Sequence, residues 1–243
     1  IPDWEAIRKA FPDLILFEDS ADTITHTPCT DISTTSFYAS HVITAGGLGG
    51  MVMFNDDGHL KRALMFRDWG RIGDNIEEPS ERFNHSVDGI PYDWKFLYGV
   101  AGYHLKACEM NAAFGLVQLD KLGGFLQTRR QNIKRYLENL KDCSYYTLPD
   151  DSQLPNWLAI PLQCPDRLDL VKFMEANDVQ TRVTFAGNIT RHPAFREYLD
   201  DFENADTIMK NGFLLGAHHG MNLEDVDRVC NLLKTFADTK VNA

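Results

Sequence analysis

The sequence predicts an α/β fold with a parallel sheet. Helical periodicity over residues 3–11 is followed by the apolar run 14–17, and short apolar runs keep alternating with helical segments along the rest of the chain. The first apolar run ends in Glu18 and Asp19, which places acidic groups at the carboxyl edge of the sheet. Open α/β folds bind ligands at that edge, so Asp19 is a candidate ligand contact.

Further elements of the first half follow in order. Residues 34–38 and 51–54 are predicted strands on either side of a loop that carries His41 and a glycine-rich segment. Residues 61–69 are a predicted helix. Residues 70–92 are rich in Gly, Pro, Asn and Asp without a clear period, which indicates a long surface loop.

The second half is predicted to contain one long helical region and a small α+β domain. Residues 106–140 have helical spacing of apolar residues, and the pair Gly123-Gly124 predicts a kink or a break there. The remaining predicted strands are 145–148, 157–162 and 181–185, and the remaining predicted helices are 166–176 and 223–237. We therefore expect two domains, 1–140 and 141–243.

The composition excludes several classes of protein. A chain of 243 residues that is 44% hydrophobic can bury a substantial core. Lys and Arg total 24 against 35 Asp and Glu, a net charge of -11 without a basic block, so nucleic acid is not an expected partner. No apolar run approaches the ~20 residues that cross a bilayer, and no secretory leader pattern opens the chain. The expected compartment is the cytoplasm.

The five cysteines have no CxxC pair and no spacing that is typical of zinc or cluster sites. We expect reduced, mostly buried thiols and no metal site.

Four side chains near the predicted sheet edge could carry chemistry. Asp19, Asp22, Ser36 and His41 would gather beside the glycine-rich loop as two acids, a hydroxyl and an imidazole. The residues alone leave a plainer interpretation open, in which the acids cap turns, the serine belongs to a strand and the histidine lies on the surface.

Six segments together resemble, in order, motifs of the DegT/DnrJ/EryC1/StrS sugar-aminotransferase family. They are residues 17–21 (FEDSA), 36–41 (SFYASH), 46–50 (GGLGG), 102–106 (GYHLK), 116–122 (LVQLDKL) and 186–195 (AGNITRHPAF). The resemblance implies fold type I of the PLP-dependent transferases, the aspartate aminotransferase-like fold. Family chains begin before residue 3, so it also implies that the N-terminal part is lacking. Residues 1–140 would then be the C-terminal part of the large PLP-binding domain, with a long connecting helix.

The resemblance assigns roles to three residues. In the family, the acid after the strand pairs with the pyridine nitrogen of pyridoxal 5'-phosphate, which corresponds to Asp19, and a serine binds the cofactor phosphate, which corresponds to Ser36. Five residues later the family has the lysine that forms a Schiff base with the cofactor, and here that residue is His41. Imidazole cannot form this Schiff base, so pyridoxal or pyridoxamine 5'-phosphate is expected to bind noncovalently.

A histidine at this position marks the sugar 3-dehydratases of the family. Although it forms no Schiff base, His41 can still move protons near neutral pH. The resemblance therefore implies a lyase of deoxysugar biosynthesis, of the kind that supplies lipopolysaccharide O-antigen. Its substrate would be an NDP-4-keto-6-deoxyhexose, its amino donor L-glutamate and its product a 4-keto-3,6-dideoxy sugar nucleotide. An ordinary nucleotide-sugar aminotransferase and a non-catalytic relative are the alternatives.

Residues 66–71 (FRDWGR) resemble the ascarylose-type dehydrases, which bind a [2Fe-2S] cluster through cysteines after this motif and after the Glu-Asp pair. Here residues 20–21 are Ser-Ala and residues 72–75 are Ile-Gly-Asp-Asn, so no iron-sulfur cluster is expected. The colitose-type reaction, which needs no cluster, is the expected one.

Two further positions depart from the wider family. Asp22 stands where the family often has a glutamine near the cofactor phenol oxygen, and the ascarylose-type enzymes also carry Asp there. His104 stands where the family has an asparagine that reaches the cofactor phosphate of the neighbouring subunit. The resemblance thus implies a homodimer with shared active sites and adds Asp22 and His104 to the cofactor-binding set.

Overall fold

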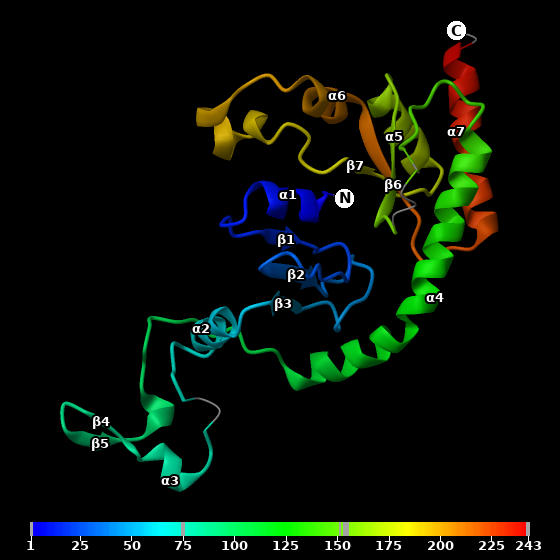
Figure 1. Ribbon diagram of the computed structural model, residues 1–243. Helices are drawn as coiled ribbons and strands as arrows, with labels where there is room; N and C mark the ends of the chain where they lie inside the picture. The colour runs from blue at the N-terminus through cyan, green and yellow to red at the C-terminus, as the bar shows by residue number, and fades with distance from the viewer. Residues whose placement is uncertain (1, 74–75, 151, 153–155, 242–243) are drawn as a thin grey trace. The chain divides into compact units, whose positions relative to one another are not determined.

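The computed structural model describes residues 2–73, 76–150, 152 and 156–241 (Figure 1). The chain divides into two compact units, Ile1–Leu119 and Asp120–Ala243. The predicted domain boundary between residues 140 and 141 stays a prediction. No helix within the described ranges is long and apolar enough to cross a bilayer.

The first unit contains a three-stranded sheet of order β1-β2-β3. Its strands are β1 (Phe17–Asp19), β2 (Ile32–Ser36) and β3 (Gly50–Phe54). β1 and β2 are parallel and pair Asp19 with Thr34, whereas β3 is antiparallel to β2. Parallel pairing at the acidic end of β1 is thus confirmed. β1 begins later than predicted, at Phe17 rather than residue 14.

Capped helices flank this sheet in the sequence. Asp3 caps α1 (Trp4–Ala10) by accepting a hydrogen bond from the Ala6 amide at 2.9 Å. Asp56 caps α2 (Asp57–Arg67), which begins four residues earlier than predicted. A carboxylate at this position satisfies an amide that has no partner within the helix.

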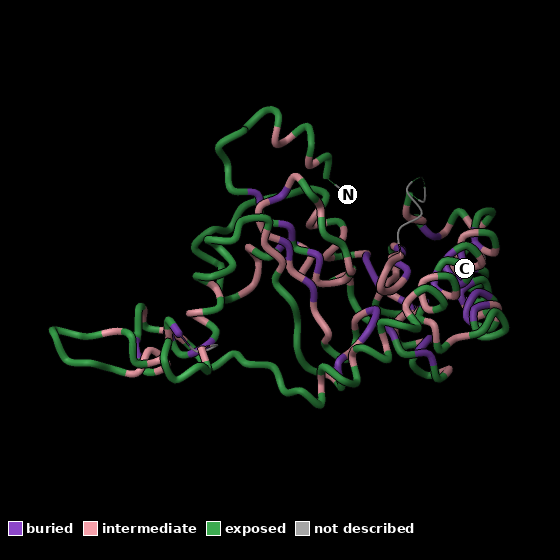
Figure 2. Tube along the Cα trace, turned by 60° about the horizontal axis from the view of Figure 1, so that its bottom comes forward, coloured by how far each residue is buried: buried purple, intermediate pink, exposed green. Residues whose placement is uncertain are grey.

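The predicted surface loop at 70–92 is wrong in part, because it contains α3 (Pro79–Arg82) and an antiparallel hairpin. The hairpin pairs β4 (His85–Val87) with β5 (Ile90–Tyr92) and is followed by the 3-10 helix η1 (Trp94–Phe96). The turn residues Asp88 and Gly89 have φ of 52° and 80°, the conformation that Asp-Gly favours between two strands. Most of the hairpin is exposed (Figure 2).

α4 (Glu109–Leu140) is one uninterrupted helix, so the break that the glycine pair could have caused is absent from it, and of the predicted kink or break the break is wrong. A Cβ on Gly123 or Gly124 would meet nothing within 4 Å. Each glycine costs about 1 kcal/mol relative to alanine. The rest of a 32-residue helix, with Arg129, Ile133, Tyr136 and Leu140 buried, outweighs that cost.

The second unit has a sheet of order β6-β8-β7, in which both outer strands are antiparallel to β8. Its elements are β6 (Ala159–Gln163), α5 (Arg167–Ala176), β7 (Arg182–Val183), η2 (Ile189–Arg191), η3 (Pro193–Tyr198), α6 (Glu203–Asn211), β8 (Gly212–Gly216) and α7 (Leu223–Val241). The helices α5 and α7 confirm their predictions. The strand predicted at 145–148 is only a single bridge from Thr147 to Gln163, and the prediction omitted α6 and β8.

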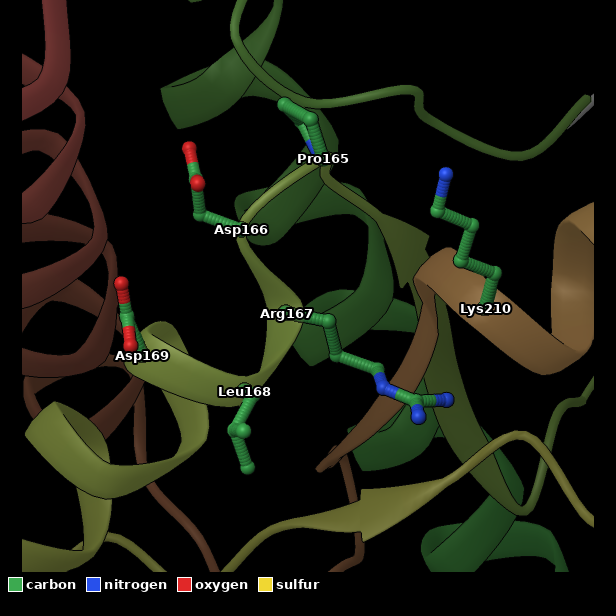
Figure 3. Close-up of a pocket in the computed structure, with 6 residues that line it drawn as sticks. All are labelled: Pro165, Asp166, Arg167, Leu168, Asp169 and Lys210. Carbon is green, nitrogen blue, oxygen red and sulfur yellow. The ribbon is translucent and has the colours of Figure 1, made fainter.

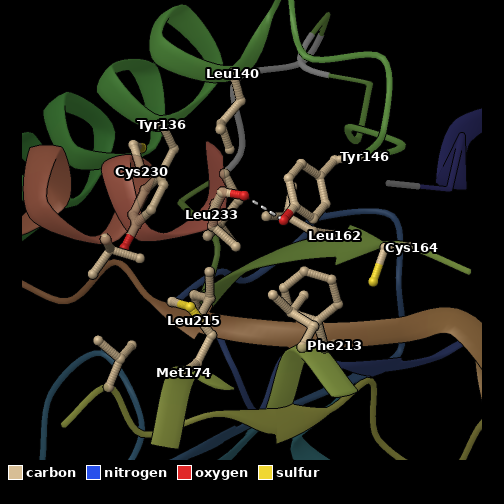
Figure 4. Close-up of a cluster of buried hydrophobic side chains, with 14 of the residues drawn as sticks. Tyr136, Leu140, Tyr146, Leu162, Cys164, Met174, Phe213, Leu215, Cys230 and Leu233 are labelled. Carbon is tan, nitrogen blue, oxygen red and sulfur yellow. Dashed lines mark hydrogen bonds between the residues drawn. The ribbon is translucent and has the colours of Figure 1, made fainter. Parts of the chain in front are cut away.

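The core of the second unit joins this sheet to the C-terminal part of α4 and to α7 (Figure 4). Tyr136 and Leu233 are fully buried in it, and the Tyr146 hydroxyl donates a hydrogen bond to the Leu233 carbonyl at 2.7 Å. Burial raises the pKa of the Cys164 and Cys230 thiols to about 11. All five cysteines are free, but only these two are buried, so the expectation of mostly buried thiols is wrong.

One cationic group in the second unit is buried without a carboxylate among its hydrogen-bond partners. Arg129 is 2% exposed and its Nη1 donates to the carbonyls of Leu158 and Trp157 at 3.0 and 3.4 Å. The ring of His219 stacks on Phe125 with centroids 3.7 Å apart. Burial, followed by the charge of Arg129, lowers the pKa of His219 from its ordinary value of 6.5. The folded protein therefore favours neutral His219.

The protein should lose stability as the pH falls below about 6.5, because the unfolded chain protonates His219 before the folded chain does. We expect His219→Phe, which keeps an aromatic ring against Phe125, to reduce that loss. Urea unfolding at pH 7.5 and pH 5.5 measures it. His59→Gln, which changes a half-exposed histidine on α2, should leave the loss unchanged, and an equal loss in both variants would contradict the explanation.

Candidate active site

The parallel strands bring four of the five predicted residues to one edge of the first sheet. Asp19 is the last residue of β1 and Ser36 the last residue of β2. The chain beyond β1 stays beside β2, because the Ser36 amide donates a hydrogen bond to the Ala21 carbonyl at 3.4 Å. Asp22 is the next residue, and the carboxylate of Asp22 reaches His41.

His41 faces Asp22 at ion-pair distance. Its Nδ1 lies 2.8 Å from Oδ1 of Asp22. The side chain of His41 is 17% exposed, which excludes the interpretation as an ordinary surface histidine. The two atoms are not aligned for a hydrogen bond, and Nδ1 has no hydrogen-bond partner among the described residues. Since Nδ1 faces the carboxylate, Nε2 is the nitrogen available for proton transfer to a bound molecule.

The segment that follows His41 is anchored in the first unit. Val42, Ile43 and Ala45 are buried, and the Ala45 amide donates to the Phe37 carbonyl at 3.2 Å. The amide side chain of Asn111, in the first turn of α4, donates to the carbonyl of Ala45. His41 therefore projects from a fixed loop.

Among the described residues, the side chains of Asp19 and Ser36 each accept one local hydrogen bond. Oδ1 of Asp19 accepts from the Ala21 amide at 3.1 Å, and the Ser36 hydroxyl accepts from the Tyr38 amide at 3.2 Å. These bonds fit the plainer interpretation of turn residues. They do not preclude binding, because Asp19 is exposed and a carboxylate accepts several hydrogen bonds.

Sequence reasoning missed the buried carboxylate next to Asp19. Glu18 is 6% exposed, and its two oxygens accept hydrogen bonds from four hydroxyls and one backbone amide. The donors are Ser20, Thr25, Thr27 (backbone), Thr30 and Ser33. Burial acts to raise the pKa of Glu18, but the hydrogen bonds led by that from Ser20 outweigh it, so the pKa is lowered. The density of Ser and Thr between residues 20 and 36 was the available signal.

His104, the fifth predicted residue, belongs to a different part of the first unit. Its backbone forms an isolated antiparallel β-bridge with Asp68. Its ring stacks on Trp69 with centroids 4.5 Å apart and an interplanar angle of 14°. The backbone segments that carry Trp69 and His104 approach closely because glycines stand at positions 70 and 102. A Cβ on Gly70 would lie 1.9 Å from the Val100 carbonyl oxygen, and one on Gly102 would lie 2.1 Å from the Gly70 nitrogen.

A pocket of about 230 Å³ in the second unit is not a candidate site. It is lined by Pro165, Asp166, Arg167, Leu168, Asp169 and Lys210. Figure 3 shows the two acids on one side of the pocket and Lys210 on the other. Tyr145 donates a hydrogen bond to Asp166 at 2.6 Å, and Lys240 donates to Asp169 at 2.8 Å. Both acids are thus used in holding the fold.

A second pocket, of about 290 Å³, lies in the first unit and is lined by Lys61, Leu64, Met65, Arg67, Asp68, Arg71 and Ile72. Arg67 forms two hydrogen bonds with Asp68, at 2.8 and 2.9 Å. The residues that line this pocket do not include Asp19, Asp22, Ser36 or His41. Among the described residues, no group of three or more His, Cys, Asp or Glu side chains could hold a metal ion.

Comparisons with known proteins agree on one family. The family model of the DegT/DnrJ/EryC1/StrS aminotransferases matches residues 2–234. The lipopolysaccharide biosynthesis protein RfbH of Salmonella typhimurium is 34% identical over 227 aligned positions, and the match covers 85% of this chain and 51% of that protein. The dTDP-4-dehydro-2,6-dideoxy-D-glucose 3-dehydratase of Saccharopolyspora spinosa is 32% identical over 253 aligned positions, and the match covers 92% of this chain and 54% of that protein.

A solved structure confirms the predicted fold class. GDP-4-keto-6-deoxy-D-mannose-3-dehydratase of E. coli with bound hydrated PLP matches with a TM-score of 0.80 at 22% identity, over 96% of this chain and 64% of that one. The chain therefore has the fold of the PLP-dependent aminotransferases. It spans about half the length of the curated relatives it matches.

Gly70→Ala should lower the free energy of unfolding by ~2 kcal/mol or more, because φ at Gly70 is +91° and the new Cβ would overlap the Val100 carbonyl. Gly89→Ala is the matched control, since Gly89 has φ of +80° but nothing within 4 Å of its Cβ position. Gly89→Ala should lower the free energy of unfolding by only about 1–2 kcal/mol, which is the cost of a left-handed backbone for alanine. Urea unfolding compares the two. Equal costs would mean that the close approach of residues 70 and 100 is not needed.

Proposed function

Since the chain belongs to the DegT/DnrJ/EryC1/StrS aminotransferase family, we propose that it carries the reaction centre of a pyridoxal phosphate-dependent sugar 3-dehydratase. The substrate is an NDP-4-keto-6-deoxyhexose, and the product a 4-keto-3,6-dideoxy sugar nucleotide for deoxysugar biosynthesis. One observation carries the proposal. A half-buried imidazole, His41, faces Asp22 at the position where an aminotransferase of this family needs a lysine. The name of the Saccharopolyspora spinosa relative, a 3-dehydratase, supports the reaction, and that of the Salmonella typhimurium relative supports a place in lipopolysaccharide biosynthesis.

The residues at the sheet edge fit the cofactor. Asp19 is an exposed carboxylate that would pair with a protonated ring nitrogen, and the Ser36 hydroxyl at the end of β2 would donate to the phosphate. Bound there, the cofactor supplies an electron sink for the elimination. With histidine in place of lysine, the chain offers no amine at that position, so binding is noncovalent.

His41 moves the proton in this proposal. Its Nε2 would accept a proton from the C4' carbon of the bound pyridoxamine form of the cofactor and would deliver it to the C3 hydroxyl of the sugar, which then leaves as water. Asp22 holds Nδ1 on the opposite side of the ring and stabilises the imidazolium while it carries the extra proton.

The remaining partners follow from the same assignment. L-Glutamate supplies the amino group, ammonia leaves at the end of the cycle, and a homodimer with shared sites brings His104 to the phosphate of the partner's cofactor. No iron-sulfur cluster takes part, since Ser20 and Ala21 follow the Glu-Asp pair without a cysteine. The ascarylose-type enzymes have further cluster cysteines at the positions of residues 72–75, and residues 74 and 75 lie outside the described residues.

The test is to incubate the complete protein with pyridoxal phosphate, L-glutamate and GDP-, CDP- and dTDP-4-keto-6-deoxy sugars. We expect deoxygenated sugar and one ammonia for each product molecule with one of these nucleotides. His41→Asn should lower the rate at least ~100-fold, which is the usual contribution of an acid-base residue. Formation of a 4-amino sugar without ammonia would instead establish the aminotransferase, and no turnover of any substrate would favour a non-catalytic relative.

His41→Lys places an amine where the aminotransferases have one. We expect this variant to retain pyridoxal phosphate covalently after borohydride reduction, detected as a mass increase of the intact protein, whereas the natural chain should not. His59→Lys, on the exposed surface of α2, is the control and should gain no adduct at matched cofactor concentration. A folded His41→Lys protein without adduct would count against the placement of residue 41 at the cofactor.

A further inference from the structure

Glu18 holds together the segment that carries two of the proposed cofactor residues. Its Oε1 accepts hydrogen bonds from Ser20 at 2.7 Å and Thr25 at 3.2 Å. Its Oε2 accepts from the Thr27 amide at 3.1 Å and from Ser33 at 3.2 Å. These donors come from both ends of the connection between β1 and β2, so one carboxylate closes it on itself.

Asp19 lies on the opposite face of β1 from Glu18. Successive side chains of a strand point to opposite faces, and here Glu18 is buried while Asp19 is exposed. Asp19 is followed by the turn in which the Ala21 amide donates to Asp19 Oδ1. Ser20, between these two residues, is the nearest donor to Glu18. Glu18 and Asp19 therefore accept hydrogen bonds from adjacent residues of the same turn, Ser20 and Ala21.

A second layer of polar contacts secures the same segment from outside. The Asn55 Nδ2 donates to the carbonyls of Thr27, Pro28 and Thr30. Oδ1 of Asn55 must therefore face His26, whose Nε2 lies 2.9 Å away, so Nε2 carries a hydrogen. Nδ1 of His26 lies 3.0 Å from the Ser33 hydroxyl, which also contacts Glu18. His26 and Asn55 thus fix Ser33, and Ser33 helps to fix Glu18.

We infer that Glu18 is a positioning residue, which aims the Asp19 carboxylate at the ring nitrogen of the cofactor. This inference rests on the proposed function. All five donors to Glu18 are neutral, so its negative charge is stabilised by hydrogen bonds alone. An amide at this position keeps the shape but loses the charge and one acceptor oxygen. Ser20 or Thr27 then loses its acceptor, and the turn at Asp19 is released.

The test compares pyridoxal phosphate with its carbocyclic analogue, in which CH replaces the ring nitrogen, by binding to the complete protein. Only the first ligand can pair with Asp19, so the ratio of the two dissociation constants reports that contact alone. We expect the natural protein to prefer pyridoxal phosphate by about tenfold or more. Glu18→Gln should remove most of this preference, with affinity for the analogue nearly unchanged.

Asp19→Asn provides the second arm of the experiment. If Glu18 acts through Asp19, adding Glu18→Gln to Asp19→Asn should change the preference no further. Glu197→Gln, at an exposed glutamate of the second unit, is the matched control and should behave as the natural protein. Should Glu18→Gln fail to fold, Ser20→Ala removes a single bond to Glu18 and should lower the preference to a smaller extent.

The possible results distinguish a structural role of Glu18 from a wrong placement of Asp19 at the cofactor. Equal weakening of both ligands by Glu18→Gln, or an unchanged preference in the folded variant, would overturn the inference and leave the proposed function standing, since Glu18 would then be merely structural. A natural protein that binds both ligands equally would remove Asp19 from the ring nitrogen, and with it both the proposed cofactor contact and the inference.

Discussion

Parallel pairing of β1 with β2 places the ends of two strands at one edge, and the candidate site depends on that constraint. A connection of twelve residues returns the chain from the end of β1 to the start of β2, and it is built almost entirely from polar side chains and turns. Parallel strands normally need a long crossover, often a helix, to return the chain. Here the twelve-residue connection contains no helix, and the hydrogen bonds that Glu18 accepts hold it together. The loop leaves Asp22 within reach of His41.

The site is held by hydrogen bonds and close packing more than by ion pairs. Asn111 and the buried residues after His41 anchor the loop that carries His41, and Glu18 anchors the connection between β1 and β2, which carries Asp22. Hydrogen bonds to a buried charge are directional, so they fix both the position and the orientation of the groups they join. This is the kind of support that a proton-transfer residue needs, because a small displacement from the reacting atom lowers the rate steeply.

Much of this arrangement could be predicted from the sequence, and the failures have physical causes. Asp19, Ser36 and His41 were predicted because strand ends and family motifs mark them. Glu18 was not, because in a sequence a buried acid looks the same as an exposed one until its donors are known. The Asp88-Gly89 hairpin signal was present but lay inside a stretch without periodicity. The Gly123-Gly124 pair predicted a break because glycine weakens a helix locally, whereas packing further along α4 decides its continuity.

The hydroxyl shell around Glu18 has an electrostatic consequence. Hydroxyl dipoles stabilise a negative charge without cancelling its field, so three negative charges, those of Glu18, Asp19 and Asp22, lie within five residues of chain at the end of β1. Such a region attracts a protonated heterocycle and repels a phosphate dianion. A ligand that carries both is therefore oriented before any specific contact forms, with its cationic ring toward the Asp19 carboxylate at the end of β1.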